Sequence, residues 1–310
     1  MKIRNLIQSP LFNVLIWSFI WALQILISRS AFNEGIGLGS YITQTCLGTF
    51  TLSLFVLLPS VMSEAKALLR DHPLSFHLVI LANFVHSGIA GVFYFTSLAL
   101  TTATNVGFLS KLSIVSTLVL ASIFLAEKLT RQKLFTLALM MVGAWLLIAY
   151  GKGLAIEPGA FLIIIACLFW SSGNVLIKSQ MKRTNISGEL IAAFRPIVGS
   201  PTLVALAAIL PWLFPTLTQH FGDNYLATET IPYSIANSFF TIGLTTFLYR
   251  SLRVSSASYV ALMSMTNPVI VTILGYLILG ESLTPIQMLG GALIIIGGIW
   301  SQNVGYLSKE

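Results

Sequence analysis

Two charged residues of this sequence lie deep inside apolar stretches, where an ionic side chain is costly to keep. Lys111 is eight residues into the stretch 103–126, and Arg195 is nine residues into the stretch 186–211. At a helical rise of about 1.5 Å per residue, both lie ~12–13 Å from the end of their helix. That is near the middle of a hydrocarbon core about 30 Å thick. Cations at that depth are candidates for ligand binding, and these two could neutralise a carboxylate or a phosphate.

Each of these cations also has a structural interpretation. Lys111 could pair with a carbonyl or a carboxylate of a neighbouring helix. Arg195 has a planar fork suited to a carboxylate, but Glu189 on the same helix is rotated away from it by roughly 120°. Pro196 follows Arg195 directly and predicts a kink there. The residues alone leave substrate binding and helix bridging both open.

His86 falls near the middle of an apolar stretch, eleven residues into 75–99. Because histidine titrates near neutral pH, it is a candidate for a proton relay, the alternative being a histidine that is only hydrogen-bonded inside the protein. The other histidines are scattered, and Cys46 and Cys167 lack metal-ligand spacing. The sequence therefore predicts no metal site and no cofactor. It also lacks the motifs of metalloproteases, serine hydrolases and phosphate-binding loops, so we expect no enzyme.

The elements that must position these residues are membrane-spanning helices. The chain of 310 residues is 56% hydrophobic and 9% charged, with a mean hydropathy of +0.88, whereas a soluble domain has about 25% charged residues. Apolar runs of about 20 residues recur along the chain and predict ten spans. They cover residues 9–29, 39–61, 75–99, 103–126, 131–150, 158–179, 186–211, 231–250, 256–280 and 284–303.

The basic residues fall almost entirely on one side of these spans. Of the 17 Lys and Arg, one set of loops and termini holds 13, the other holds Arg29 and Lys152, and two lie within spans. The 13 are Lys2, Arg4, Lys66, Arg70, Lys128, Arg131, Lys133, Lys178, Lys182, Arg183, Arg250, Arg253 and Lys309. Cytoplasmic loops carry such an excess, so we expect both termini in the cytoplasm. The net charge of +7 thus reflects orientation and indicates no nucleic-acid partner.

The sequence repeats itself at a shift of 154 residues, and such repetition is decisive for the fold. Asn83, Phe93, Ser97, Leu98, Ala103, Val106, Val115, Glu127, Leu129, Thr130 and Gly143 recur as Asn237, Phe247, Ser251, Leu252, Ala257, Val260, Val269, Glu281, Leu283, Thr284 and Gly297. With five spans per half, the second half begins on the opposite side of the membrane. The sequence therefore predicts an all-α integral membrane protein of ten transmembrane helices in two inverted five-helix repeats, residues 1–152 and 153–310, as in many secondary transporters.

Some polar residues in or between the spans match across the repeat, and others do not. Asn105, Asn174 and Asn267 lie inside spans without a matched partner, so they are candidates to line a cavity. Glu127 and Glu281 match each other and sit at helix junctions. We expect each of them to satisfy free backbone N–H groups at the start of the helix that follows it.

The segment Phe124-Leu125-Ala126-Glu127-Lys128-Leu129-Thr130 precedes a helix that contains Gly143. Its second copy, Leu279-Gly280-Glu281-Ser282-Leu283-Thr284, precedes a helix that contains Gly290, Gly291, Gly297 and Gly298. Both copies resemble the signature of the EamA family of the drug/metabolite transporter superfamily. The resemblance covers nearly the whole chain. It implies a ten-helix transporter of amino acids or other small metabolites, in which the first four helices of each half surround a central cavity.

The resemblance also assigns places to particular side chains. It puts the aromatic residues of the first helix of each half, Trp21, Phe169 and Trp170, at the cavity, where they could stack on a ligand; aromatic residues are also common anchors at span ends. The family often has a proline near the middle of the fourth helix. Pro268 supplies it in the second half, but Ile114 stands at the matched position, so we expect a break in the second half only.

Together with the resemblance, which alone implies export, the sequence predicts a secondary transporter that exports amino acids or small organic anions by alternating access, in the plasma (inner) membrane of a bacterium. The expected partners are the lipid bilayer and a small-molecule substrate with a carboxylate, and nothing in the sequence supports a homo-oligomer. Two other classes stay open: a transporter of drug-like or cationic solutes, and a non-transporting membrane sensor or assembly subunit.

Overall fold

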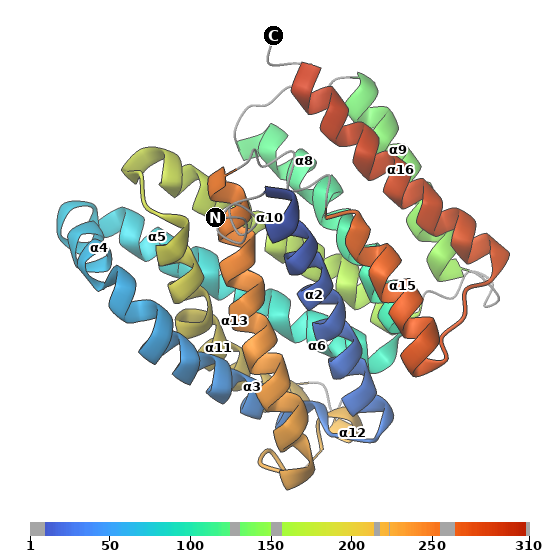
Figure 1. Ribbon diagram of the computed structural model, residues 1–310, viewed down its shortest axis with the longest axis horizontal. Coiled ribbons are helices and arrows are strands. Elements are labelled where there is room, and N and C mark those ends of the chain that lie inside the picture. Colours follow the sequence, from blue (N-terminus) through green and yellow to red (C-terminus); the bar gives the residue numbers. More distant parts are fainter. Residues whose placement is uncertain are drawn as a thin grey trace, which may run out of the picture.

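The protein is described by a computed structural model, which places the backbone of residues 10–124, 131–149, 157–213, 218–222, 224–254 and 264–307. Within these ranges the regular structure is helical throughout (Figure 1). The first half forms the spans α2 (Pro10–Asn33); α3 (Leu38–Leu52), η1 (Ser53–Leu57) and α4 (Leu58–Asp71); α5 (Pro73–Asn83), η2 (Phe84–Ile89) and α6 (Ala90–Leu100); α7 (Ala103–Leu109), η3 (Ser110–Leu112) and α8 (Ser113–Phe124); and α9 (Arg131–Ala149).

The second half repeats this order of five spans. They are α10 (Pro158–Thr184), α11 (Gly188–Leu213), α13 (Ile231–Val254), α15 (Thr266–Leu279) and α16 (Pro285–Leu307), with the short α12 (Thr218–Phe221) and η5 (Thr228–Thr230) before α13. Each predicted span thus corresponds to a helix or to a run of consecutive helices.

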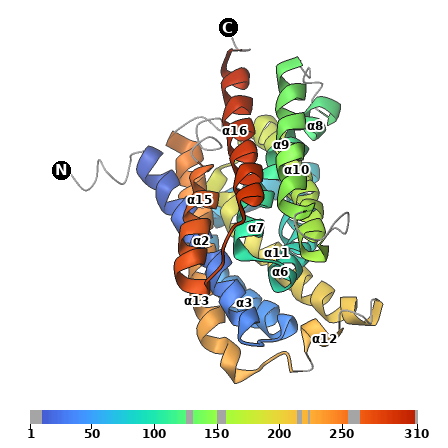
Figure 2. The same ribbon diagram turned by 90° about the vertical axis from the view of Figure 1, so that its right-hand side faces the viewer.

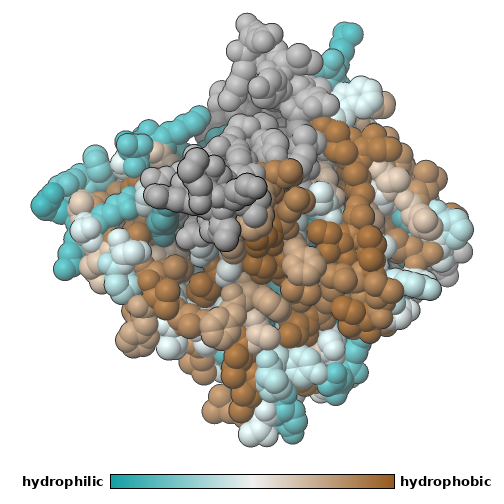
Figure 3. All heavy atoms as spheres, in the orientation of Figure 1, coloured by the Kyte–Doolittle hydropathy of each residue, from teal (hydrophilic) through white to brown (hydrophobic). Residues whose placement is uncertain are grey.

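The helices have the length and the surface of a membrane protein. Five continuous helical segments of the described chain are long and apolar enough to cross a membrane, and shorter apolar helices lie within α9, α15 and α16. Large apolar side chains stay exposed on them, for example Phe55 at 73%, Leu277 at 69% and Trp212 at 88%. Figure 3 shows apolar side chains across the middle of the visible face, while polar ones gather at its left edge and its lower end. Lipid, in place of water, would cover such a surface.

Helices of the two halves pack on each other in matched pairs. In the first pair, the α13–α2 contact corresponds to the α10–α6 contact. In the second pair, α15–α2 corresponds to α10–α8, and in the third, α13–α3 corresponds to α11–η2. Exchanging the halves converts the first contact of each pair into the second. The contacts α3–α11 and α9–α16 each join equivalent helices of the two halves. This pattern is what a pseudo-twofold axis requires, and it confirms the ten-helix fold of two inverted repeats.

The fifth helices, α9 and α16, lie side by side at one edge of the bundle in both views (Figures 1 and 2). Glycines bring their backbones into contact. A Cβ on Gly143 would lie 2.6 Å from the carbonyl oxygen of Gly290, and a Cβ on Gly290 would lie 2.6 Å from that of Gly143. Small residues permit such close approach between helices in lipid. The pair also contacts η3, the turn that carries Lys111.

The structure corrects two expectations about individual spans. The second span continues to Asp71, well beyond the predicted end at residue 61, and it contains the π-helical turn η1. The fourth span is also broken, although it lacks a proline: α7 ends at Leu109 and the 3₁₀ turn η3 follows. The Ser110 hydroxyl, which donates to the carbonyl of Gly107 at 2.9 Å, accompanies this tightening. A 3₁₀ turn inside a helix often marks a functional hinge.

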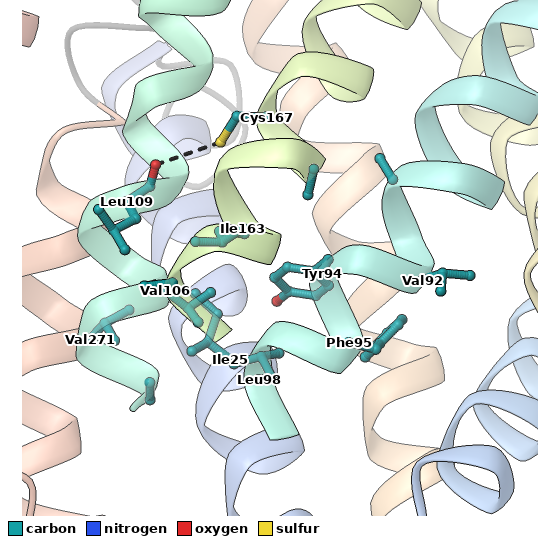
Figure 4. Close-up of a cluster of buried hydrophobic side chains, with 14 of the residues drawn as sticks. Ile25, Val92, Tyr94, Phe95, Leu98, Val106, Leu109, Ile163, Cys167 and Val271 are labelled. Carbon is teal, nitrogen blue, oxygen red and sulfur yellow. Dashed lines mark hydrogen bonds between the residues drawn. The ribbon is translucent and has the colours of Figure 1, made fainter. Parts of the chain in front are cut away.

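Apolar packing surrounds α7 on both of its sides. Figure 4 shows Val106 beside Ile163 of α10 and the Leu109 carbonyl pointing toward Cys167, with Val271 of α15 on the other side. The Cys167 thiol approaches the carbonyl of Leu109 at 3.5 Å. All of these side chains are buried. The segment that carries Lys111 is therefore held between two helices of the second half.

A buried polar network joins α13 to α2 and α3. The Gln24 amide donates to Asn237 and to Thr241, each at 2.8 Å, and the Asn237 amide donates to Ser28 at 3.2 Å and to the hydroxyl of Tyr41. Ser28 and Tyr41 are 2.8 Å apart. Polar side chains of this kind hold helices together within a membrane.

The equivalent place in the other half carries no such network. Asn83, the repeat partner of Asn237, donates to the carbonyl of Val79 on its own helix at 2.9 Å. Its side-chain oxygen is buried without a hydrogen-bond partner among the described residues. The first helices of the two halves, α2 and α10, align at a shift of 149 residues, which matches Trp21 with Trp170 and Arg29 with Lys178. At this shift, Gly173 and Ile177 stand where α2 has Gln24 and Ser28. The repeats are alike in fold but differ in their polar contacts.

Candidate functional site

Lys111 lies in η3, in the interior of the bundle, and its side chain is only 3% exposed. Its ammonium lies 4.1 Å from the centre of the Trp21 ring of α2. In the described part of the chain, this ring and the thiol of Cys167 are the groups that interact with it. A cation over an indole gains up to about 2 kcal/mol when desolvated, which is small beside the several kcal/mol that burying a charge costs. The ammonium is therefore available to a negative ligand.

Aromatic rings lead from Lys111 to a second polar group. Trp21 contacts Trp170 of α10 edge to face, with ring centres 6.5 Å apart, and Trp170 lies 6.4 Å from the imidazole of His86. Tyr94 of α6 packs against Trp170 at 5.4 Å, and Trp17 stacks on Trp21 at 5.6 Å. We call Trp17, Trp21, Tyr94 and Trp170 the aromatic array. Its members Trp21 and Trp170 come from the first helix of each half, where the resemblance implied a cavity.

Arg195 closes the other end of the array. Its Nη2 lies 2.8 Å from Nε2 of His86 and 3.2 Å from Oδ1 of Asn174. An arginine nitrogen can only donate, so Nε2 of His86 must accept and cannot carry a proton. The neutral imidazole therefore has its hydrogen on Nδ1, which lies 3.4 Å from the Ser87 hydroxyl. Three helices, α10, α11 and the η2 turn, meet at this contact.

The structure places three other candidates away from the array. Asn105 lies near the start of α7, where its amide donates to Thr101 at 3.1 Å and to Glu157 at 3.4 Å. Asn267 donates to the carbonyl of Ser18 at 3.0 Å and joins α15 to α2.

Phe169 stacks on Phe93, with ring centres 5.7 Å apart. It is the neighbour of Trp170 in the chain, and successive residues point about 100° apart on a helix. Of the three aromatic candidates, Trp21 and Trp170 therefore belong to the array, and Phe169 packs between α10 and α6.

Glu281 joins the two repeats. Its carboxylate accepts from the backbone N–H of Ala103 at 2.7 Å, from that of Thr104 at 2.9 Å, and from the Thr104 hydroxyl at 2.7 Å. We call Ala103, Thr104 and Glu281 the Glu281 junction. Gly275 makes room for it, since a Cβ there would meet the Glu281 carboxylate and the Thr104 hydroxyl at 3.2 Å. A carboxylate on free N–H groups at a helix start is favourable.

This finding corrects the expected role of Glu281, which was to serve the helix that follows it. Thr284 and Gln287 instead provide the hydrogen bonds at the start of α16. The backbone N–H of Thr284 donates to the side-chain oxygen of Gln287 at 3.1 Å, and the backbone N–H of Gln287 donates to the hydroxyl of Thr284 at 3.4 Å. Glu281 is thereby free to serve α7 of the other repeat. Glu127 lies outside the described residues. Pro268 is the third residue of α15, where a proline is tolerated because the first turn needs no N–H donors.

Arg29 was not singled out from the sequence, yet it lies beside this junction. It donates to the carbonyls of Leu98 and Ala99 at the end of α6, at 2.9 and 3.0 Å, and it interacts with the carboxylates of Glu281 and Glu157. The sequence feature that could have pointed to Arg29 is its match with Lys178, which stands at the equivalent position in the first helix of the second half. Tyr94, which the sequence reasoning also missed, has no comparable signal because α6 is apolar on several sides.

The described residues form no group of three His, Cys, Asp or Glu side chains that could hold a metal ion. Cys46 and Cys167 are both buried free thiols. The chemistry of the site is therefore that of two buried cations, a neutral histidine and an aromatic array, which together can bind a solute with a negative group and an apolar part.

A bundle of inverted repeats around a buried polar centre is typical of membrane transport proteins. The chain matches the profile of the EamA-like transporter family over residues 8–149 and 157–301, one match for each repeat. The protein belongs to this family, whose members are transporters.

Relatives in other organisms carry transporter names. An "Uncharacterized transporter" of Methanothermobacter thermautotrophicus is 25% identical over 76% of this chain and 66% of its own length. A "Probable amino-acid metabolite efflux pump" of Salmonella typhimurium is 29% identical over 61% of this chain and 64% of its own. The "Riboflavin transporter ImpX" of Fusobacterium nucleatum subsp. nucleatum is 24% identical over 62% and 64%. The matching part spans just under two thirds of each relative.

A solved crystal structure has the same fold. It covers 96% of this chain and 99% of its own, with a TM-score of 0.58 and 17% sequence identity. At that identity the likeness concerns the fold alone, and the substrate has to be argued from the residues of this chain.

Proposed function

We propose that this protein is a secondary transporter that exports amino acids or small organic anions across the plasma (inner) membrane of a bacterium by alternating access. The two five-helix units, residues 1–152 and 153–310, would rock against each other around the aromatic array. The substrate would carry a carboxylate and an apolar part.

The observation that carries this proposal is the position of Lys111. Its side chain is buried, with the ammonium over the indole ring of Trp21. A negative group on a ligand would offset the desolvation of this cation, whereas a cationic ligand would add to the repulsion. The apolar part of the same ligand would lie against Trp21 and Trp170. The name of the Salmonella relative, an amino-acid metabolite efflux pump, agrees with this substrate class.

Flux through the purified protein tests the proposal directly. In proteoliposomes that contain no other protein and no ATP, we expect saturable counterflow of L-leucine and L-phenylalanine. The carboxylate-free analogues L-leucinamide and L-phenylalaninamide should compete poorly, because they lack the group that Lys111 and Arg195 would bind. Equal competition by the amides would favour a transporter of cationic solutes. Absence of any flux would favour a sensor or assembly subunit.

The proposed orientation, with both termini in the cytoplasm, has its own test. Lys66 in α4 and Glu229 in η5 are both exposed and are predicted on opposite sides of the membrane. We expect cysteines at these two positions to react with an impermeant maleimide from opposite sides of intact cells. The native Cys46 and Cys167 are buried, so background labelling should be low. Labelling of both sites from the same side would refute the topology.

A further inference from the structure

The contact between His86 and Arg195 links two events: protonation of the His86 imidazole and binding of a ligand by the Arg195 guanidinium. While Nε2 of His86 accepts from Nη2 of Arg195 at 2.8 Å, that nitrogen cannot bind a proton. A proton on Nε2 would set two cations face to face. The arginine contact and the proton are therefore mutually exclusive at this atom.

The surroundings of His86 offer nothing else that would compensate a second positive charge. α10 presents Trp170, Gly173 and Asn174 to this part of η2, and η2 itself adds Ser87. Among the described residues around the imidazole, Arg195 of α11 is the one charged group that acts on it. Protonation thus depends on what Arg195 binds.

The backbone around His86 is built to hold the ring against α10. His86 lies in the π-helical turn η2, and such turns are frequent at functional sites. A Cβ on Gly173 would lie 2.6 Å from the Cβ of His86, so only glycine fits there. As a residue His86 is half-buried.

We propose that His86 binds a proton together with the substrate carboxylate, so that the protein moves one proton with each carboxylate in the same direction. When a carboxylate takes the Nη2 donor of Arg195, Nε2 of His86 loses its partner and its lone pair accepts a proton. The new N–H bond then faces a carboxylate where it had faced a guanidinium. No covalent bond of the substrate changes. This inference rests on the function proposed above, and export with a proton would be driven by the outward gradient of the substrate, because an inward proton gradient opposes it.

The sign of the pH dependence follows from reciprocity. If a bound carboxylate strengthens proton binding, then a proton strengthens carboxylate binding by the same factor. Apparent affinity should therefore rise as pH falls, by at most about tenfold per pH unit for one coupled proton. Direct binding of the carboxylate by Arg195 without a role for His86 would give a flat profile instead.

The test uses L-leucine and L-phenylalanine, which stay zwitterionic between about pH 6 and pH 8, where histidine titrates. In proteoliposomes with an entrapped pH dye, we expect affinity to rise toward pH 6 and one proton to accompany each amino acid in the same direction. His86→Gln keeps an acceptor for Arg195 but cannot bind a proton, so its affinity should not change with pH and its flux should move no proton. His86→Asn should behave alike, and a melting curve shows that each variant is folded.

The control is His77→Gln, an exposed histidine that contacts the carbonyl of Pro73; it should keep the wild-type pH dependence. Lys111→Met should bind more weakly but also keep that dependence, because the coupling runs through Arg195. A pH profile that is flat in the wild type, or unchanged in the folded His86 variants, overturns the inference and leaves the proposed function standing. If neither amino acid is carried at any pH, the proposed function fails and the inference with it.

Discussion

Replacing Lys111 by methionine is expected to abolish most carboxylate binding while leaving the protein as stable as before or more so. Truncating one partner of a buried charge pair costs about 2–5 kcal/mol, which is roughly 30-fold or more in affinity. The same change removes a desolvated charge from the interior, and apolar replacements of buried ions are often stabilising. The methionine thioether can also pack against the indole of Trp21.

Arg195→Met should lower affinity to a similar degree but should also lower the melting temperature. Arg195 bridges His86 and Asn174, so its loss leaves polar groups of two other helices without a donor. The two measurements are the dissociation constant of L-leucine and the thermal midpoint of the purified variants. Lys66→Met, at an exposed site on α4, is the matched control and should alter neither. Unchanged affinity in both folded variants would make the two cations structural.

The second large effect is expected at the Glu281 junction. Glu281 accepts three hydrogen bonds from the start of α7, and bonds to an ionised group contribute about 1.5–3 kcal/mol each. Because α15 and α7 belong to different repeats, Glu281→Ala should favour separation of these helices by at least about 2 kcal/mol, or roughly 30-fold in the equilibrium. Thr104→Val removes one bond and should have a smaller effect.

The reporter for this opening is a cysteine in place of Thr101, which is 2% exposed beside the junction. We expect its reaction with a maleimide to be more than about tenfold faster when Glu281 is alanine. Glu229→Ala, at an exposed site in η5, should leave the rate unchanged. Equal rates in all variants would show that the junction does not hold this end of the bundle closed.

The features that could be predicted from the sequence are those that depend on one span at a time or on comparing the chain with itself. The burial of Lys111 could be anticipated because its position within an apolar run sets its depth, and the spans could be placed because hydropathy is local. The inverted repeat could be found because it compares the chain with itself. None of these requires knowing which helix packs on which.

What the sequence could not predict depends on contacts between distant spans. The His86–Arg195 contact joins residues 109 positions apart, and Glu281 reaches back 177 and 178 positions to α7. Neither pairing follows from a helical period. The break at η3 was missed because a proline was taken as its only sign, whereas a serine hydroxyl accompanies it. Phe169 and Trp170 could not be separated without knowing which face of α10 meets α2.

Asn83 and Asn237 make different hydrogen bonds, and this difference affects how the helix bundle can move. Asn237 ties α13 to α2 and α3 through buried hydrogen bonds, whereas Asn83 bonds within its own helix and faces a helix that has glycine and isoleucine at the equivalent places. Deforming the tied side breaks several polar contacts in a medium that offers no replacement. The other side is held by the contacts of Arg195 with His86 and Asn174, and a carboxylate that takes Nη2 of Arg195 would release them. The bundle would therefore move mainly at α5, η2, α10 and α11, against the stiffer frame of α2, α3 and α13, when a ligand binds Arg195.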